Sequence, residues 1–410
     1  MDLRLYAHTK LNATIKLPAS KSISNRALLI AALCDSTAID GVAQCDDTDA
    51  MLAALSQVNE GVVDVGAAGT AMRFLTAYFA VKNPGKTVIL RGSERMHSRP
   101  IGELVSALRL LGAEITYLEN EGFPPLKITA AKLTPRRLTM RGDVSSQFIS
   151  ALMMIAPLIG GLEIELTGDI VSRPYIDMTA LLMREMCADV EISGNTVRVG
   201  DAPYHWHHLG IEADWTAASY WVALKALMPE SSIRLQGLTE NRIQGDSMLL
   251  QLSKNLGIDC KWDGRDLVLA SGYQCACSSF MDMAATPDIA QTFVTALCLM
   301  NKPFRITGLR TLRIKETDRI EALRSQLLKL GYKITIEGND GISWHGEKTE
   351  ADNQPVINTF NDHRMAMSFA AAAVRFPGII IADAQVITKS YPDFWHHLAE
   401  AGFRIEEIEP

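Results

Sequence analysis

The segment ETDRIEALRSQLLKLGYKITI, residues 316–336, contains the pattern that decides the fold. Its apolar residues recur at helical spacing, Gly331 then stops the helix, and KITI follows as a short strand. The same order of polar or proline-containing start, amphipathic helix, stop and strand recurs in segments 99–117, 173–192, 244–262 and 391–408. A sixth and weaker copy spans residues 46–65.

The stop residues of the five clear copies are evenly spaced. They are Gly112, Cys187, Gly257, Gly331 and Gly402, separated by 75, 70, 74 and 71 residues. Each interval also holds a second helix that is apolar nearly all round, hence buried, and short strands such as KTVILRG. We therefore predict six units of two helices and three or four strands. The alternative is that helix ends simply resemble one another in any α/β protein.

These units predict an α/β protein of two similar domains with three units each. The boundary lies near residues 209–214, where the fourth buried helix begins. A chain of 410 residues, 48% of them apolar, exceeds one ordinary hydrophobic core, which also favours two domains.

Composition narrows the class of protein further. The longest apolar run, residues 150–162, contains Pro157 and is shorter than a membrane span. The first ten residues, MDLRLYAHTK, lack a secretory signal pattern, and seven scattered cysteines fit reduced thiols, so we expect a soluble cytoplasmic protein. A net charge of −7 argues against nucleic acid as a partner.

Metal binding has little support in the sequence. Cys275 and Cys277 form a single CxC without a second pair at zinc spacing. His205, His207 and His208 form a cluster that we interpret as an exposed loop, although imidazoles at this spacing are also able to bind metal. We therefore expect no metal site.

Cations gather at or just before predicted helix starts, where the helix dipole is already positive. They are Lys21, Arg26, Arg73, Arg95, Arg99, Arg173, Lys315, Arg319, Arg364 and Lys389. Small hydroxyl or amide groups accompany them, namely Ser20, Ser22, Ser24, Ser145, Ser146, Gln147 and Ser172. A polyanionic ligand would satisfy both the backbone N–H groups and these side chains. For any single serine, ordinary helix capping is the alternative.

Two carboxylates stand among these cations. Asp288 and Glu316 are candidates for general acid–base catalysis, with a helix cap or an ion pair as the alternative for each. The segment GAAGTAMR, residues 66–73, matches no nucleotide-binding loop, and Gly69 indicates a close approach of the backbone to a ligand or another segment.

Seven motifs together resemble the 3-phosphoshikimate 1-carboxyvinyltransferase family, also called 5-enolpyruvylshikimate-3-phosphate (EPSP) synthase. They are LPASKSISNRALLIAAL (17–33), GAAGTAMRFL (66–75), RMHSRPIGELVSAL (95–108), GDVSSQFISALMM (142–154), SRPYIDMT (172–179), RIKETDRI (313–320) and NDHRMAM (361–367). The resemblance implies an inside-out α/β barrel fold with three βαβαββ repeats in each domain. It implies one domain of residues 17–212 on the shikimate 3-phosphate side. A second domain, residues 1–16 plus 213–410, would lie on the phosphoenolpyruvate side, with the active site in the cleft between them.

The resemblance also implies a reaction and a set of residues for it. The carboxyvinyl group of phosphoenolpyruvate would move to the 5-hydroxyl of shikimate 3-phosphate, with release of phosphate and without a cofactor. Asp288, Glu316 and Lys21 would be catalytic. Shikimate 3-phosphate would be bound by Lys21, Ser22, Arg26, Ser145, Ser146, Gln147, Ser172, Asp288, Thr311 and Lys315. Phosphoenolpyruvate would be bound by Lys21, Gly69, Arg99, Gln147, Arg319, Arg364 and Lys389.

Three positions depart from the family pattern. Ala67 and Thr311 stand where many relatives have Asn, and Phe74 stands where they have Pro. Two other functions stay open: the related transferase that acts on a uridine-diphosphate amino sugar, and a non-catalytic anion-binding relative. The first uses a reactive loop cysteine, and this chain has no cysteine between Cys45 and Cys187. We expect a monomer.

Overall fold

The computed structural model describes residues 1–36, 39–56, 60–134, 136–240, 243–272 and 279–408, so that Cys275 and Cys277 lie outside the described part. The chain divides into two units. Unit 1 combines Met1–Ala19 with Glu212–Pro410, and unit 2 is Ser20–Ile211. Each unit is described below by itself.

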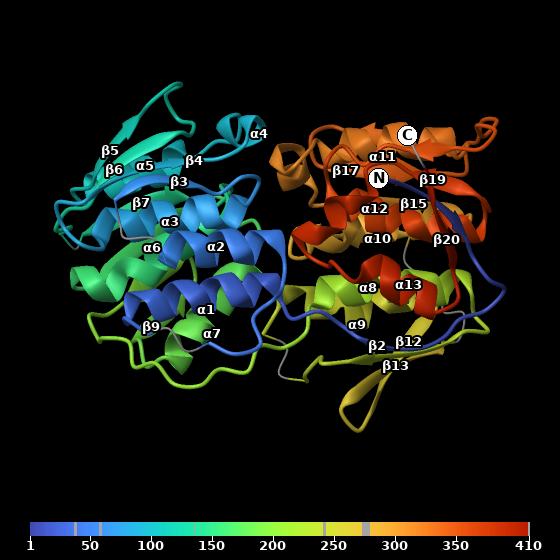
Figure 1. Ribbon diagram of the computed structural model, residues 1–410, viewed down its shortest axis with the longest axis horizontal. Helices are drawn as coiled ribbons and strands as arrows, with labels where there is room; N and C mark the ends of the chain where they lie inside the picture. Colours follow the sequence, from blue (N-terminus) through green and yellow to red (C-terminus); the bar gives the residue numbers. More distant parts are fainter. Residues whose placement is uncertain (37–38, 57–59, 135, 241–242, 273–278, 409–410) are drawn as a thin grey trace. The chain divides into compact units, whose positions relative to one another are not determined.

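Within the described residues, five four-stranded sheets share one topology, and many of their strands are labelled in Figure 1. In each sheet the first two strands of the spatial order run parallel and the other neighbours run antiparallel. Unit 2 holds two of these sheets. The first consists, in spatial order, of β3 (Gly61–Asp64), β4 (Thr87–Arg91), β6 (Leu126–Thr129) and β5 (Glu114–Tyr117). The second consists of β7 (Arg137–Arg141), β8 (Leu162–Thr167), β10 (Thr196–Val199) and β9 (Val190–Ser193).

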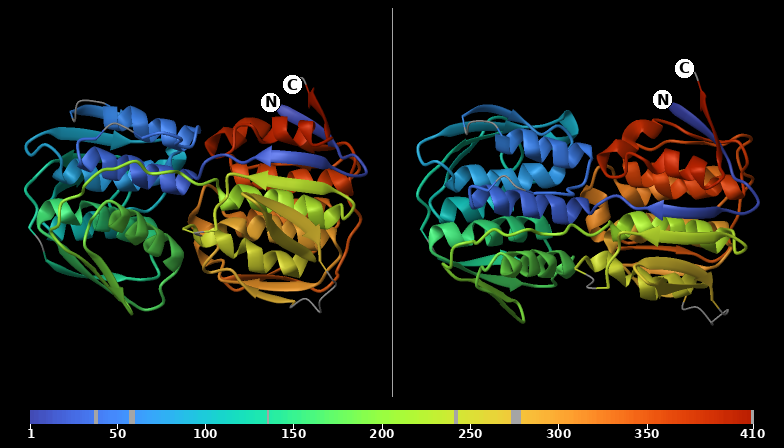
Figure 2. Two further views of the ribbon diagram at one scale, coloured as in Figure 1. Left: turned by 90° about the horizontal axis from the view of Figure 1, so that it is seen from below. Right: turned by 60° about the horizontal axis from the view of Figure 1, so that its bottom comes forward.

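Unit 1 holds the other three sheets, again given in spatial order. They are β2 (Asn12–Lys16), β11 (Ser232–Gln236), β13 (Asp266–Ser271), β12 (Ile258–Asp263); β14 (Phe280–Asp282), β15 (Phe304–Thr307), β17 (Gly341–Trp344), β16 (Thr335–Glu337); and β18 (Val356–Ile357), β19 (Ile379–Ile381), β1 (Asp2–Tyr6), β20 (Arg404–Ile408). Strand β1 pairs with β20, so the two ends of the chain lie side by side (Figure 2).

An inner layer of buried helices forms the core of each unit. These helices are α1 (Lys21–Leu33), α3 (Gly69–Val81) and α6 (Ser146–Ile155) in unit 2, and α8 (Trp215–Leu227), α10 (Ala290–Leu299) and α12 (His363–Ala370) in unit 1. Every residue of α8, α10 and α12 is buried, as expected for helices that are apolar all round. Their few hydroxyls bond one another, for example Ser219 to Thr292 and Thr292 to Ser368.

Amphipathic outer helices precede the edge strands. They are α2 (Asp46–Ser56), α5 (Gly102–Leu110), α7 (Arg173–Glu185), α9 (Leu249–Leu252), α11 (Arg319–Lys329) and α13 (Phe394–Glu400). The five predicted stop residues all adopt positive φ, between 66° at Cys187 and 120° at Gly402. Glycine adopts this backbone region without steric cost, which explains why four of the five stops are glycine. The short remaining helices are α4 (Glu94–His97), η1 (Ala156–Ile159), η2 (Gly245–Met248), η3 (Ser253–Leu256), η4 (Pro287–Ile289), η5 (Arg310–Ile314), η6 (Ala371–Val374) and η7 (Ala384–Lys389).

The mixed α/β fold class is confirmed, but two expectations of detail were wrong. The sixth unit, α1 with α2, has no sheet of its own within the described ranges, because residues 39–45 and 201–211 form no strand ladder. The helix expected over 244–256 is divided into η2, α9 and η3. Its Ser253 hydroxyl donates to the carbonyls of Leu250 and Ile258, a local bond that competes with regular helix geometry. Among the described helices, none combines the length and the apolar character that crossing a bilayer requires.

Candidate active site

Unit 1 brings a cluster of predicted site residues together around the start of α11. Arg319, whose side chain is 1% exposed, contacts three carboxylates. Its Nη1 lies 3.2 Å from Asp288 Oδ1, its Nη2 3.0 Å from Glu316 Oε2, and its Nε 2.7 Å from Asp362 Oδ2. One buried guanidinium therefore links both predicted catalytic carboxylates.

Three further cations complete this cluster. Asp288 is contacted by Lys315 Nζ at 3.6 Å and by Arg364 Nη2 at 3.0 Å, and Glu316 by Lys389 Nζ at 3.0 Å. We call these seven residues the acid–cation cluster: Asp288, Lys315, Glu316, Arg319, Asp362, Arg364 and Lys389. An incoming anion is able to replace the carboxylates as partner of the cations, because both offer negatively charged oxygens.

Burial and charge act in opposite directions on the cations. Burial lowers the pKa of Lys315, and the nearby Asp288 only partly opposes this. Burial also lowers the pKa of Arg319, but Asp362 and Glu316 outweigh it and raise the pKa above its ordinary value. Arg319 therefore stays charged, whereas Asp288 offsets only part of the effect of burial on the pKa of Lys315.

Asp246 is a functional candidate that the sequence pattern did not reveal. The residue is 4% exposed, its Oδ2 accepts a hydrogen bond from the Thr216 hydroxyl, and no described residue bonds Oδ1. Burial, with the charge of Asp288, raises the pKa of Asp246 to about 7, although Thr216 and Arg364 oppose this. A carboxyl near neutral pKa beside Asp288 and Arg364 is typical of functional sites.

Three aspartates recur at equal spacing along unit 1. Asp214, Asp288 and Asp362 stand at the starts of the three inner helices of unit 1, separated by 74 residues each. Asp214 and Asp362 cap their helices, accepting from the N–H of Thr216 and of Arg364. Asp288 contacts three cations, and Asp362 combines its capping bond with an ion pair to Arg319, so two of these three aspartates belong to the acid–cation cluster.

Helix starts also position the predicted residues of unit 2. Ser20 caps α1, and the next residue, Lys21, contacts Asp47 of α2 at 3.4 Å. Asp47 was not predicted. Ser22 follows on the same turn of α1 and is half-buried.

Arg26, one turn further along α1, is a buried cation with neutral partners. It donates to the Thr179 hydroxyl at 2.7 Å, the Ser22 carbonyl at 2.9 Å and the Ser150 hydroxyl at 3.3 Å, with a longer contact to the Tyr175 carbonyl. Burial lowers the pKa of Arg26 to about 10. Its charge therefore lacks the compensation that a carboxylate would give.

The start of α3 meets Arg99 and Gln147. A methyl group added at Gly69 would lie 2.5 Å from Arg99 Nη1, so the predicted close approach is to this guanidinium. Gln147 donates from Nε2 to the Thr70 hydroxyl at 3.0 Å, which joins the starts of α6 and α3. Ala68, before α3, gives no side-chain cap to the first N–H groups of this helix.

The three predicted serines differ in their local roles. Ser145 caps α6 by accepting from the Gln147 N–H, and Ser146 is buried on the first turn. Ser172 precedes α7 with φ 58° and makes no capping bond, an uncommon conformation for a residue other than glycine. Thr311, in unit 1, has a buried hydroxyl without a hydrogen-bond partner among the described residues.

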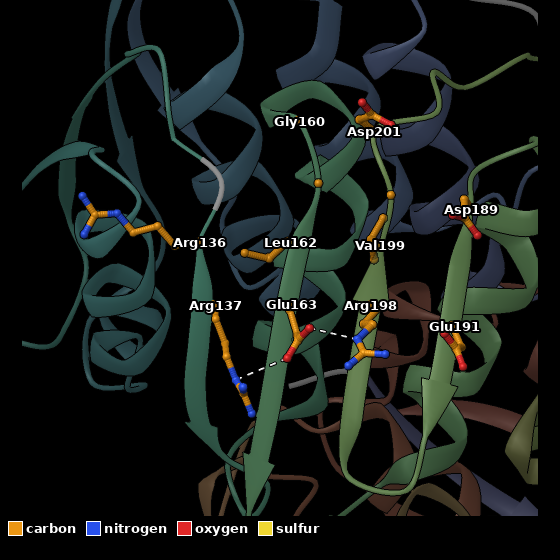
Figure 3. A pocket seen from close by; sticks show the side chains of 12 residues that line it. Arg136, Arg137, Gly160, Leu162, Glu163, Asp189, Glu191, Arg198, Val199 and Asp201 are labelled. Carbon is orange, nitrogen blue, oxygen red and sulfur yellow. Dashed lines mark hydrogen bonds and ion pairs between the residues drawn. The ribbon is translucent and has the colours of Figure 1, made fainter.

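A hollow on the sheet face of β7, β8, β10 and β9 is a different kind of surface (Figure 3). It is lined by Arg137, Glu163 and Arg198 among others, and both arginines pair with Glu163, at 3.2 and 2.9 Å. None of the predicted site residues lines it. His205, His207 and His208 are exposed, and in the described part of the chain no group of three metal-binding side chains forms.

Within each unit taken by itself, cations and hydroxyls near buried helix starts are groups suited to small polyanions, and unit 1 adds two carboxylates suited to acid–base chemistry. The EPSP synthase (3-phosphoshikimate 1-carboxyvinyltransferase) family model matches residues 5–60 and 56–398, and the chain belongs to this family. A 3-phosphoshikimate 1-carboxyvinyltransferase of Bacteroides fragilis is 48% identical over 409 residues, 99% of both chains. One of Shewanella halifaxensis is 37% identical over 427 residues, 96% of this chain and 98% of the relative. An EPSP synthase structure from Acinetobacter baumannii shares the fold, with a TM-score of 0.76, 20% identity and full coverage of both chains.

Proposed function

We propose that this chain transfers the carboxyvinyl group of phosphoenolpyruvate to the 5-hydroxyl of shikimate 3-phosphate and releases phosphate, with the residues of the helix starts as its machinery. Family membership supports the reaction. The observation that carries the residue assignments is the acid–cation cluster, in which four cations contact Asp288 or Glu316 and one of them, Arg319, contacts both. The product lies on the route to aromatic amino acids through the shikimate pathway.

The acid–cation cluster would bind phosphoenolpyruvate and exchange protons with the reactants. Arg319, Arg364 and Lys389 would hold its phosphate and carboxylate, which releases Asp288 and Glu316 from their ion pairs. Glu316, protonated once its cations have turned to the substrate, would then give that proton to the methylene carbon, and the 5-oxygen would attack the cation-like C2 while Asp288 accepts the hydroxyl proton.

Collapse of the resulting tetrahedral intermediate restores the vinyl group. The proton returns from the methyl carbon to Glu316, the bond from C2 to the phosphate oxygen breaks, and its electron pair leaves with phosphate, which takes the proton that Asp288 had accepted. Fixed cations that stabilise developing negative charge commonly contribute most of such a rate enhancement. These steps use only side chains and the two substrates, so turnover should survive dialysis against a metal chelator.

The residues of unit 2 would bind shikimate 3-phosphate and complete the phosphoenolpyruvate site. Arg26 is a buried cation suited to a carboxylate. The substrate phosphate would accept from Ser145, Ser146 and Ser172. The remaining assignments are Ser22, Gln147, Thr311, Lys315 and Asp288 toward shikimate 3-phosphate, and Lys21, Gly69, Arg99 and Gln147 toward phosphoenolpyruvate, with Lys21 touching both.

A phosphate-release assay tests the function. Purified protein with phosphoenolpyruvate and shikimate 3-phosphate should release phosphate, and replacing the acceptor with a uridine-diphosphate amino sugar should abolish release. Release with only the amino sugar would assign the related transferase. No release with either acceptor, while shikimate 3-phosphate still binds, would indicate a non-catalytic relative.

We also propose a monomeric cytoplasmic enzyme. Cys34, Cys45, Cys187, Cys260 and Cys298 are free thiols, which fits a reducing compartment. Light scattering coupled to gel filtration should give a mass near the 45.0 kDa of one chain, and twice this value would overturn the monomer.

A further inference from the structure

Phe74 lies beside Arg26, although the two residues come from different helices. The centre of the Phe74 ring is 5.2 Å from the Arg26 guanidinium carbon, and the Tyr175 ring is 5.9 Å from it. Phe74 is fully buried and Arg26 is 2% exposed, so water screens this contact little. Both distances fall within the range of cation–π attraction.

The hydrogen bonds of Arg26 are too weak to fix the position of its guanidinium group by themselves. All four acceptors are neutral, and two of the bonds are long, at 3.3 Å to Ser150 and 3.4 Å to the Tyr175 carbonyl. Weak neutral acceptors compensate a buried charge less than a carboxylate does. An aromatic ring adds an attraction of its own and restricts where the guanidinium plane lies.

We propose that Phe74 is a positioning residue for shikimate 3-phosphate, acting through Arg26 rather than through the phosphoenolpyruvate end of its helix. This inference rests on the proposed function, in which Arg26 binds the carboxylate of that substrate. Phe74 is five residues beyond Gly69 on α3, yet its ring faces a guanidinium of α1. A substitution of Phe74 that acts through Arg26 should weaken binding of shikimate 3-phosphate, whereas one that acts through the start of α3 should weaken binding of phosphoenolpyruvate.

The test is Phe74→Leu, which removes the ring and keeps an apolar side chain. We expect the KM and the Kd of shikimate 3-phosphate, the latter by calorimetry, to rise about tenfold, because a desolvated cation–π contact is lost. The KM of phosphoenolpyruvate and kcat should stay within about twofold. Phe74→Tyr, which keeps the ring, should restore most of the affinity.

Phe79→Leu is the matched control, because Phe79 is also buried on α3 and its ring meets Tyr78 instead of a cation. It should leave both KM values near wild type. If Phe74→Leu does not fold, Tyr175→Leu removes the other ring at a half-buried position and should weaken shikimate 3-phosphate selectively.

Three outcomes would overturn the inference in an active wild-type enzyme. They are a rise confined to the KM of phosphoenolpyruvate, equal rises for both substrates, and an equal effect of Phe79→Leu. Failure of the proposed function is separate, since the wild type itself would then release no phosphate.

Discussion

Asp246→Asn should stabilise unit 1 against unfolding, and by more as the pH rises. The carboxyl has an ordinary pKa of 3.8 and a folded-state pKa of about 7. Between these values the folded state binds the proton and the unfolded state does not, so the wild type loses stability as the pH increases. At 1.36 kcal/mol per pKa unit, the full loss is about 4 kcal/mol, reached above about pH 7. Asn does not ionise, and its amide oxygen is still able to accept from Thr216.

Urea unfolding at pH 5 and pH 8 measures this effect. Five of the six tryptophans, all but Trp206, belong to unit 1, so their fluorescence reports mainly on it. The free energy of unfolding of the variant relative to wild type should increase by about 2–3 kcal/mol from pH 5 to pH 8. Asp201→Asn, at an exposed position of unit 2, serves as the control and should show no such increase. The reasoning would be refuted if the difference in free energy of unfolding between Asp246→Asn and the wild type were the same at both pH values.

Three further substitutions test the proposed site. Asp288→Asn should reduce kcat by about 10²- to 10⁴-fold, the usual contribution of a general base, while calorimetry still detects shikimate 3-phosphate; near-normal turnover would contradict the assignment. Glyphosate should inhibit the wild type in competition with phosphoenolpyruvate. Gly69→Ala should raise the Ki of glyphosate by about tenfold or more and the KM of phosphoenolpyruvate by less, because the new methyl group displaces Arg99 and narrows the binding pocket. A wild type that glyphosate does not inhibit would refute this. Arg319→Met should lower the free energy of unfolding by about 3–5 kcal/mol, since Asp362 loses its buried counter-charge, and a loss below about 1 kcal/mol in urea unfolding would count against it.

The sequence was most informative where a local rule repeats. The α/β fold class follows from helix stops, and Gly112 through Gly402 all adopt the positive φ that a stop requires. Local rules fail where a side-chain bond that the residue pattern does not show decides the structure. Residues 244–256 have a helical pattern, but the Ser253 hydroxyl bonds the carbonyl of Ile258 and the helix is divided.

Predicted site residues show the same limit. Residue type and expected position near a helix start were enough to select Arg319 and Lys389, but two carboxylate partners of Arg319, Asp288 and Asp362, and the partner of Lys389, Glu316, come from other segments. Asp246 has the same local appearance as any acid in a first helical turn, and only its burial near Asp288 distinguishes it. Phe74 was noticed as a departure from the family, whereas its contact with Arg26 depends on packing between helices.

The pairing of β1 with β19 and β20 affects how the chain folds while it is being synthesised. Its neighbours β19 and β20 begin at Ile379 and Arg404, so β1 waits for about 370 residues of translation. At roughly 5–20 residues per second, this delay is roughly 20–75 s. Unit 2 is continuous in sequence and is able to fold on the ribosome during that time, while β1 has no ladder partner. Since unpaired strands promote aggregation, slower translation in an expression host should lower the yield of folded protein.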